Sequence, residues 1–485
     1  MTLPSVTRGT GYEPVIGLEV HCQLSTQSKL FCGCSTAFGQ PPNTQTCPVC
    51  LGHPGTLPVL NAEAVRLTVR AALALGCTIA DRSVFARKHY FYPDLPKGYQ
   101  ISQYELPTCI GGSVPVDLDG VARSFALTRI HMEEDAGKSV HTDGPHSEID
   151  LNRAGTPLIE IVSEPVFRSA DEAVAYLKEL RNLVRTLGIC DGHLEQGSFR
   201  CDANVSVRPI GRERFGTKVE LKNLNSFAFI KRAIEYEIAR QVEAIESGQS
   251  IVQETRLWNE REGRTRPMRG KEDAHDYRYF PDPDLPALHV PAALIAMERA
   301  ALPELPSARR TRYREALLLS PYDAEVLTSE PATSAYFEAV LATGADAKLA
   351  ANWVLSELKG RLNADGLDYV HSPVTPAALG LLLERLGTGR ISGKLAKDAF
   401  GRMYGGETAE AALAAVGEIV ADAGLLDAAV AAALDAAPRE VEQYLGGKTK
   451  VVGFFVGQVM KATQGKASPP VVQALVVQSL EARRS

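Results

Sequence analysis

A run of ten residues near the start of the chain, Val15–Leu24, alternates between apolar and polar side chains and constrains the fold more than any other segment. This two-residue period predicts a β-strand with one buried face. The apolar positions are Ile16, Leu18, Val20, Cys22 and Leu24. Glu19 and His21 fall on the other face, about 7 Å apart, so that one ion or one substrate can contact both. A solvated strand face with this composition is the simpler alternative.

Two more segments carry carboxylates where strands are expected. Glu160 lies inside the apolar run Leu158–Val162, and a buried carboxylate is costly unless it is paired or bound to a metal. The run Arg129–Asp135 ends in three acidic residues. A solvated turn and a role in a site explain this run about equally well. An oxygen-rich site with one imidazole suits Mg²⁺ or Mn²⁺, and here it would comprise Glu19, His21, Glu134 and Glu160.

Four of the nine cysteines lie close together, as Cys32, Cys34, Cys47 and Cys50. Two tight pairs separated by a loop can supply the four thiolates of a tetrahedral zinc site, although the first pair is Cys-x-Cys rather than Cys-x-x-Cys. Unrelated reduced thiols are the alternative. A site closed by four sulfurs has no open position for water, so this zinc would be structural.

Two segments suggest contact with nucleotides or RNA. Lys88–Gln100 is a proline-broken loop rich in aromatic and basic side chains, a composition that suits a nucleotide or a single-stranded RNA end. A packed surface loop is the alternative. Gly446–Lys466 carries lysines that would suit an RNA backbone or merely solubilise the surface, namely Lys448, Lys450, Lys461 and Lys466.

Several common catalytic patterns are missing from the sequence. Gly446-Gly447-Lys448-Thr449 lacks the first glycine and the preceding strand of a phosphate-binding loop, and no nucleophile elbow or His-Glu-x-x-His motif occurs. The net charge of −6 argues against general coating of polyanions. No apolar run approaches a transmembrane length, and no signal peptide is recognisable, so a cytoplasmic protein without membrane contact is expected.

The order of strand and helix patterns predicts an α+β fold with a largely antiparallel sheet. A proline-dense stretch, Phe280–Pro286, indicates a domain boundary. Helical patterns follow from about residue 308, and the composition shifts again near Gly405. We therefore expect three domains, covering 1–295, 296–405 and 406–485.

Long stretches of the chain resemble the GatB family, the B subunits of tRNA-dependent amidotransferases. The matching motifs cover essentially the whole chain, and they are Val15–His21, Tyr90–Gln103, His131–Lys138, Asp150–Pro165, Arg200–Val207, Glu220–Phe227, Asp276–Pro281, Ala351–Leu355 and Gly453–Gly465. The resemblance implies a cradle domain similar to glutamine synthetase, then an all-helical domain, then a helical, YqeY-like tail domain that binds tRNA.

The resemblance also implies an activity. Members of that family are subunits of a ligase that forms carbon–nitrogen bonds with glutamine as the amido donor. The ligase is a heterotrimer that also contains an amidase-type A subunit and a small C subunit. The B subunit would use ATP and Mg²⁺ to phosphorylate the side-chain carboxylate of Glu-tRNA(Gln) or Asp-tRNA(Asn), and ammonia from the A subunit would displace the phosphate. The cognate aminoacyl-tRNA synthetase is a further expected partner.

Carried over by motif, the Mg²⁺ ligands would be Glu19, His21, Glu134 and Glu160, with Glu133 as the rival of Glu134. The four clustered cysteines match the zinc-binding variant of the family. Contacts with ATP or the tRNA 3′ end would come from Tyr90, Tyr92 and Lys97. The competing hypotheses are a tRNA-binding scaffold without catalysis, in which the carboxylates merely pair with basic residues, and a free-standing metal hydrolase.

Overall fold

The computed structural model describes residues 10–118, 120–141, 146–268, 277–418, 423–463 and 467–483. Asp276 and Lys466, from two of the motifs above, lie outside the described residues. The chain divides into two compact units, Met1–Arg309 and Arg310–Ser485. The predicted boundaries near residues 295 and 405 stay predictions.

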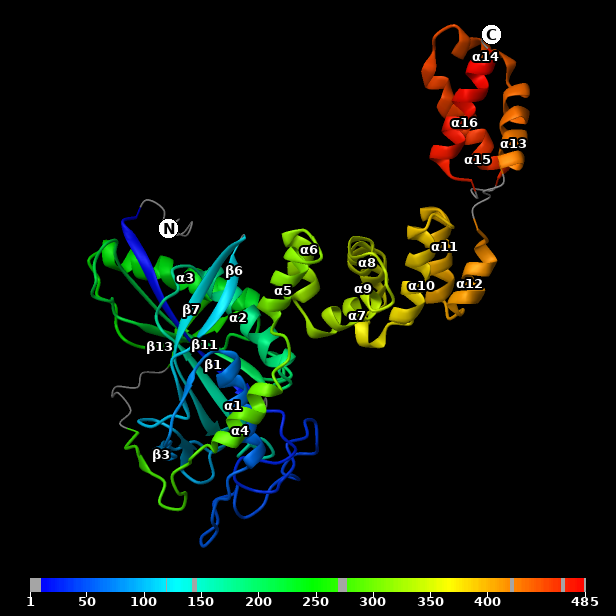
Figure 1. Ribbon diagram of the computed structural model, residues 1–485. Helices are drawn as coiled ribbons and strands as arrows, with labels where there is room; N and C mark the ends of the chain where they lie inside the picture. The colour runs from blue at the N-terminus through cyan, green and yellow to red at the C-terminus, as the bar shows by residue number, and fades with distance from the viewer. Residues whose placement is uncertain are drawn as a thin grey trace. The chain divides into compact units, whose positions relative to one another are not determined.

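A ten-stranded sheet forms the centre of the first unit (Figure 1), with the strand order β14-β13-β12-β11-β1-β10-β7-β5-β2 and with β6 paired to β7. Of the described strand pairs, only β12 and β13 run parallel, so the mixed α+β fold with a largely antiparallel sheet is confirmed. The strands are β1 (Tyr12–Gln23), β2 (Thr78–Ile79), β5 (Cys109–Ile110), β6 (Ser113–Leu118), β7 (Val121–Glu134), β10 (Pro157–Ser163), β11 (Phe199–Pro209), β12 (Val219–Lys222), β13 (Thr255–Asn259) and β14 (Arg264–Pro267).

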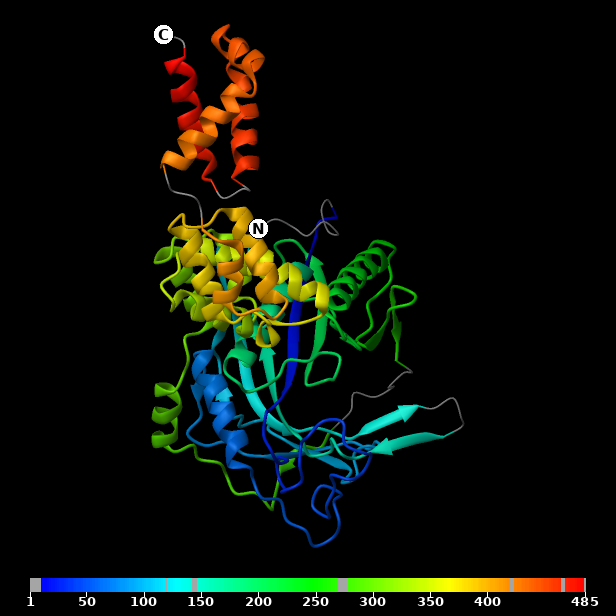
Figure 2. The ribbon, with the colours of Figure 1, turned by 90° about the vertical axis from the view of Figure 1, so that its right-hand side faces the viewer.

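Two smaller strand groups complete the first unit. A three-stranded sheet joins β15 (Phe280–Pro281), β3 (Ala86–His89) and β4 (Tyr99–Ser102). A separate hairpin pairs β8 (Lys138–His141) with β9 (Ser147–Asp150) and projects from the rest of the unit in Figure 2. The aromatic and basic loop therefore joins β3 to β4, and β3 also pairs with β15.

The alternation in β1 sorts its side chains between a core and an open face, as predicted. Ile16, Leu18, Val20 and Cys22 are almost completely buried in one hydrophobic cluster with α1 (Ala62–Ala74), α2 (Ala170–Thr186) and α3 (Phe227–Glu246). The side chains of Ser169 and Ser226 cap α2 and α3 by accepting backbone N–H bonds. The helices cover the apolar face of the sheet and leave the face of Glu19 and His21 free of them.

The rest of the described chain is helical. The helices are α4 (Ala292–Ala300), α5 (Pro306–Glu315), α6 (Pro321–Thr328), α7 (Pro331–Leu341), α8 (Ala347–Trp353), α9 (Lys359–Asp365), α10 (Pro376–Gly387), α11 (Gly393–Tyr404), α12 (Ala409–Val416), α13 (Ala423–Asp435), α14 (Pro438–Leu445), α15 (Val452–Ala462) and α16 (Pro469–Ala482). One π-helical turn, Val354–Leu358, joins α8 to α9. The second unit contains two separate hydrophobic clusters, one built from α5–α12 and one from α13–α16.

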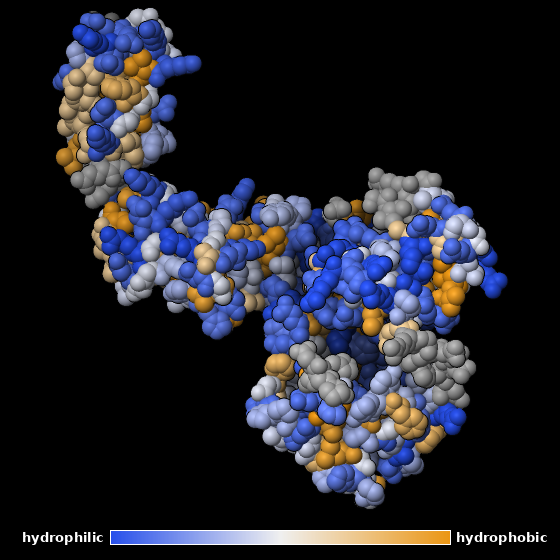
Figure 3. Space-filling view, turned by 180° about the vertical axis from the view of Figure 1, so that it is seen from behind, coloured by the Kyte–Doolittle hydropathy of each residue, from blue (hydrophilic) through white to orange (hydrophobic). Residues whose placement is uncertain are grey.

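The face of the protein that Figure 3 shows is mainly polar. In the face shown in Figure 3, hydrophilic residues predominate and hydrophobic side chains form scattered patches. Among the described helices, none combines the length and the apolar character required to span a lipid bilayer.

A pair of helical glycines offers a test of packing in the second unit. A Cβ atom at Gly380 in α10 would lie 2.2 Å from Oγ1 and 2.7 Å from Cβ of Thr343, whereas one at Gly360 in α9 would meet nothing within 4 Å. We expect Gly380→Ala to lower the free energy of unfolding by about 1–3 kcal/mol through overpacking. Gly360→Ala should raise it by up to about 1 kcal/mol through helix propensity. Denaturant unfolding of both variants checks this, and equal effects would contradict it.

Candidate functional site

Four neighbouring strands place a row of polar side chains across the open face of the sheet. In the register of β7, β10, β1 and β11, His131 lies opposite Glu160, Glu160 opposite His21, and His21 opposite Arg200. Side chains of residues that are paired across strands lie on the same face. Glu160, which the sequence placed inside an apolar run, is therefore flanked by a histidine on each side.

Glu133, two residues beyond His131 in β7, completes a compact cluster with these groups. His21 Nε2 lies 3.5 Å from Glu133 Oε1 and 3.4 Å from Glu160 Oε2. His131 Nε2 lies 3.3 Å from Glu160 Oε2 and 3.7 Å from Glu133 Oε2. We call His21, His131, Glu133 and Glu160 the carboxylate cluster. One ligand atom from each of His21, Glu133 and Glu160 lies within 4.8 Å of the others, so these three could share a metal ion.

The charges of the cluster stabilise one another. Burial alone would lower the pKa of His131, but the carboxylates of Glu160 and Glu133 raise it to about 9. Burial would raise the pKa of Glu160, but the two imidazoles hold it well below its ordinary value. Without a metal, the buried carboxylates are thus balanced by protonated histidines.

Glu134 points away from the carboxylate cluster, because adjacent residues of a strand face opposite sides. Its carboxylate pairs with Lys97 and accepts a 2.9 Å hydrogen bond from the backbone N–H of Ile101. The structure therefore groups Glu133, and not Glu134, with His21 and Glu160. Glu133, Glu134 and Asp135 are each 5% exposed or less, which excludes the solvated turn considered above.

Glu19 lies beside the cluster without joining its closest contacts. Its Oε1 accepts a 2.9 Å hydrogen bond from Asn204 Nδ2. Burial, followed by the charges of Glu160, Glu220 and Asp202, raises the pKa of Glu19. This carboxylate would gain from a nearby cation.

The aromatic and basic loop faces the same region. Lys88 Nζ lies 4.9 Å from the ring centroid of Tyr277 and 5.8 Å from that of Tyr90. Although burial would lower the pKa of Lys88, the carboxylates of Glu133 and Glu160, with two nearby tyrosines, raise it. Of the predicted contacts, Lys97 is engaged with Glu134, and the Tyr90 hydroxyl donates to Gln100 Oε1 at 3.2 Å.

Sequence reasoning gave no role to His131 or Lys88 and ranked Glu133 behind Glu134. The signal for two of these was the alternation Ile130-His131-Met132-Glu133, which places the polar pair opposite two apolar residues. Lys88 stood inside the aromatic and basic loop, but nothing local distinguished it from Lys97.

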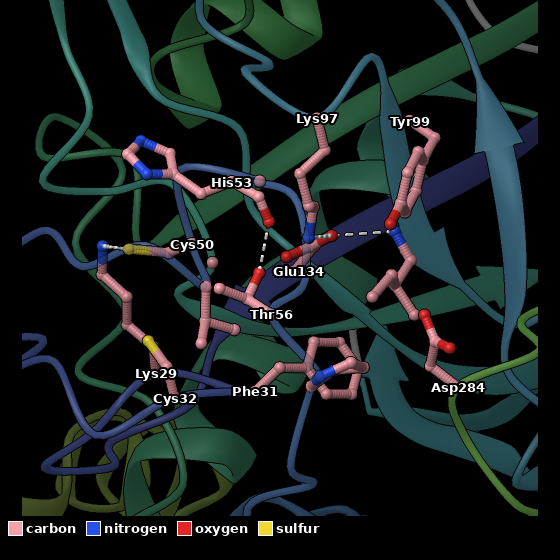
Figure 4. Close-up of a pocket in the computed structure, with 15 residues that line it drawn as sticks. Lys29, Phe31, Cys32, Cys50, His53, Thr56, Lys97, Tyr99, Glu134 and Asp284 are labelled. Atoms are coloured by element: carbon pink, nitrogen blue, oxygen red, sulfur yellow. Dashed lines mark hydrogen bonds and ion pairs between the residues drawn. The ribbon is translucent and has the colours of Figure 1, made fainter.

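The four clustered cysteines form a second candidate metal site, because their sulfurs lie within 4.8 Å of one another. Lys29, which is fully buried, has its Nζ 3.6 Å from Cys50 Sγ (Figure 4). Hydrogen bonding from Cys32, with help from the Cys47 backbone and the Lys29 charge, lowers the pKa of Cys50 to about 4. A converging set of sulfurs beside a buried ammonium fits zinc, because zinc is held by thiolates.

This cysteine loop also contacts the ion pair at the end of β7. A Cβ atom at Gly52, two residues after Cys50, would lie 2.6 Å from Lys97 Cγ. Figure 4 shows Lys97 beside Glu134 in the same cavity that Lys29 and Cys50 line. The loop therefore holds the lysine that neutralises Glu134.

Known protein families and proteins match almost the whole chain. A family model described as "GatB/GatE catalytic domain" matches residues 14–296, and one described as "GatB domain" matches residues 335–480. A protein of Geobacter sulfurreducens, named as the B subunit of an aspartyl/glutamyl-tRNA(Asn/Gln) amidotransferase, is 58% identical over 97% of this chain and 99% of its own length. Proteins of the same name from Thioalkalivibrio sulfidiphilus and Solidesulfovibrio magneticus are 56% and 53% identical over 97% of this chain.

The raised pKa of His131 predicts a pH dependence of stability in metal-free protein. Because the folded-state pKa of about 9 exceeds the ordinary 6.5, the stabilisation by protonated His131 is complete below about pH 6.5 and lost as the pH rises through about 9. We expect the melting temperature to fall between pH 7 and 10, and to fall less in His131→Gln. Calorimetry of both proteins with chelator present checks this, and parallel pH profiles would contradict it.

Proposed function

The chain belongs to the GatB family of tRNA-dependent amidotransferase subunits, and we propose that it phosphorylates the side-chain carboxylate of a misacylated tRNA so that ammonia can displace the phosphate. Membership makes it a subunit of a ligase that forms carbon–nitrogen bonds. The observation that carries the proposal is the carboxylate cluster on the open face of the sheet. A free carboxylate is a poor acceptor for ammonia, whereas an acyl phosphate has a good leaving group.

The proposed reaction has two displacements. An oxygen of the aminoacyl carboxylate attacks the γ-phosphorus of ATP, and ADP leaves. The nitrogen of ammonia then attacks the acyl carbon, and inorganic phosphate leaves as the nitrogen loses a proton. Both steps depend on orientation and on neutralising negative charge, which fixed side chains can supply.

The residues of this chain fit a divalent cation at the cluster. His21, Glu133 and Glu160 would hold Mg²⁺, with Glu19 beside them and with Glu133 taking the place predicted for Glu134. Such an ion supplies charge neutralisation to substrate phosphates when bound. Lys88, held among tyrosines near these carboxylates, would meet the anionic substrate from the other side, and Tyr90 and Tyr92 could stack on the nucleotide or on the tRNA end.

The proposed substrates and partners follow from the family and from the names of the relatives. They are Glu-tRNA(Gln) or Asp-tRNA(Asn), a glutamine-hydrolysing A subunit that supplies ammonia, and a small C subunit. The amide donor chemistry would lie in the partner, in agreement with the absence of a nucleophile motif in this sequence.

Replacing Glu160 tests catalysis against the scaffold alternative. In the reconstituted complex with ATP, Mg²⁺, glutamine and misacylated tRNA, Glu160→Gln should slow amidation at least about 100-fold, because the variant lacks a carboxylate that would hold the cation that neutralises phosphate charge. tRNA binding, measured by filter retention, should persist.

Glu164→Gln is the matched control, because Glu164 follows β10 and pairs with Thr128 outside the cluster. Normal amidation by Glu160→Gln would favour the scaffold, and turnover of the isolated chain without tRNA would favour a hydrolase.

We also propose that Cys32, Cys34, Cys47 and Cys50 hold a structural zinc ion. Because the buried ammonium of Lys29 offsets the negative charge of the thiolates, Lys29→Met should increase the rate of zinc transfer to a chelator by about 10- to 100-fold. Lys231→Met removes a lysine charge from an exposed ion pair on α3 and should leave this rate unchanged. Zinc content and release are read with a metallochromic dye. Equal release from both variants would contradict a role for Lys29.

A further inference from the structure

The two oxygens of the Glu133 carboxylate have different partners. Glu133 Oε2 accepts a 3.1 Å hydrogen bond from Ser102 Oγ and lies 3.7 Å from His131 Nε2. Glu133 Oε1 lies 3.5 Å from His21 Nε2. One oxygen of Glu133 thus faces the protein interior, and the other faces His21.

The two histidines also lie on different sides of the cluster, with His131 on the inner side and His21 on the outer side. The side chain of His131 is 4% exposed and that of His21 is 18% exposed. His131 Nδ1 is buried and has no hydrogen-bond partner among the described residues. The contacts of Nε2 with Glu160 and Glu133 are therefore the polar interactions that fix this ring.

We propose that His131 is a positioning residue, which holds one oxygen of Glu133 from the inner side so that the other oxygen converges with His21 and Glu160 on a divalent cation. This inference rests on the proposed function, because it takes the cluster to be the cation site. Ser102 would assist by holding the same oxygen of Glu133.

The physical need for such a residue comes from repulsion between the carboxylates. Two negative groups that converge on one point turn away from each other unless donors restrain them. Partners of this kind outside the ligand set orient the ligands, and their loss typically weakens metal binding 10- to 100-fold. His131 lies two residues before Glu133 in the same strand, β7, and Ser102 lies in β4 of the three-stranded sheet, so both donors are held by regular strands.

Two substitutions of His131 test whether the site needs a hydrogen-bond donor at the position of Nε2 or needs the imidazole ring itself. The amide N–H of Gln reaches about the position of Nε2, whereas that of Asn reaches only about as far as Nδ1. With Mn²⁺ as the probe, and the free ion measured by electron paramagnetic resonance, we expect His131→Asn to bind at least 10-fold more weakly. His131→Gln should stay within about threefold of the unaltered chain.

Spin-echo detection of ¹⁴N coupling to Mn²⁺ adds a readout that altered packing does not change. The imidazole coupling should remain in His131→Gln, because His21 supplies it. Loss of the coupling in that variant would make His131 a ligand and overturn the proposal. Unaltered affinity in both variants, or equal loss in both, would overturn it as well.

Two further variants keep the test decisive. Ser102→Ala removes only the second donor to Glu133 and should weaken Mn²⁺ binding about two- to fivefold. This variant tests the inner restraint even if the His131 variants fold poorly, and unchanged binding would count against that restraint.

Glu160→Gln tests the cation site itself. Unchanged Mn²⁺ binding by Glu160→Gln would remove the proposed function, whereas loss there with normal binding in His131→Asn would remove only the role of His131.

Discussion

The burial of negative charge in the sheet is the constraint on which the first unit depends. Glu160 lies in the middle of an apolar strand, and a carboxylate there is tolerated only with compensating charge. The compensation comes from the strands on either side, since His131 and His21 are its partners in β7 and β1. One ionic cluster therefore fixes the register of three strands. On the other face of the sheet, the helices pack against Ile16, Leu18 and Val20, and this packing favours the same register.

Local periodicity predicted the parts of this structure that depend on neighbours in sequence. The buried residues of α3 recur at helical spacing, because a helix face that packs on a sheet has to repeat its apolar positions. The alternation in β1 likewise placed Glu19 and His21 on the open face. The gathering of Cys32, Cys34, Cys47 and Cys50 followed from their spacing, although their role as zinc ligands stays a prediction.

The remaining features depend on contacts between distant segments, and no local pattern determines them. Lys97 and Glu134 are 37 residues apart, and their pairing decides that Lys97 is not free at the open face. The same pairing places the Glu134 carboxylate away from His21 and Glu160, with which the prediction had grouped it. Lys29 is a single lysine in a polar stretch, so no local pattern predicts that it is buried. The loop that carries the cysteines folds back and buries it beside Cys50. The partners of Lys97, Glu134 and Lys29 therefore depend on how the chain folds back on itself, and the residue types alone do not determine them.

Glu133 and Glu134 follow each other in β7 and serve opposite sides of it. One belongs with the histidines, and the other with the lysine that the cysteine loop holds. Inserting or deleting one residue in this part of the strand would exchange the two glutamates and separate both from their partners. A change of length in this segment is therefore tolerable only if the contacts on both sides of the sheet are rebuilt together.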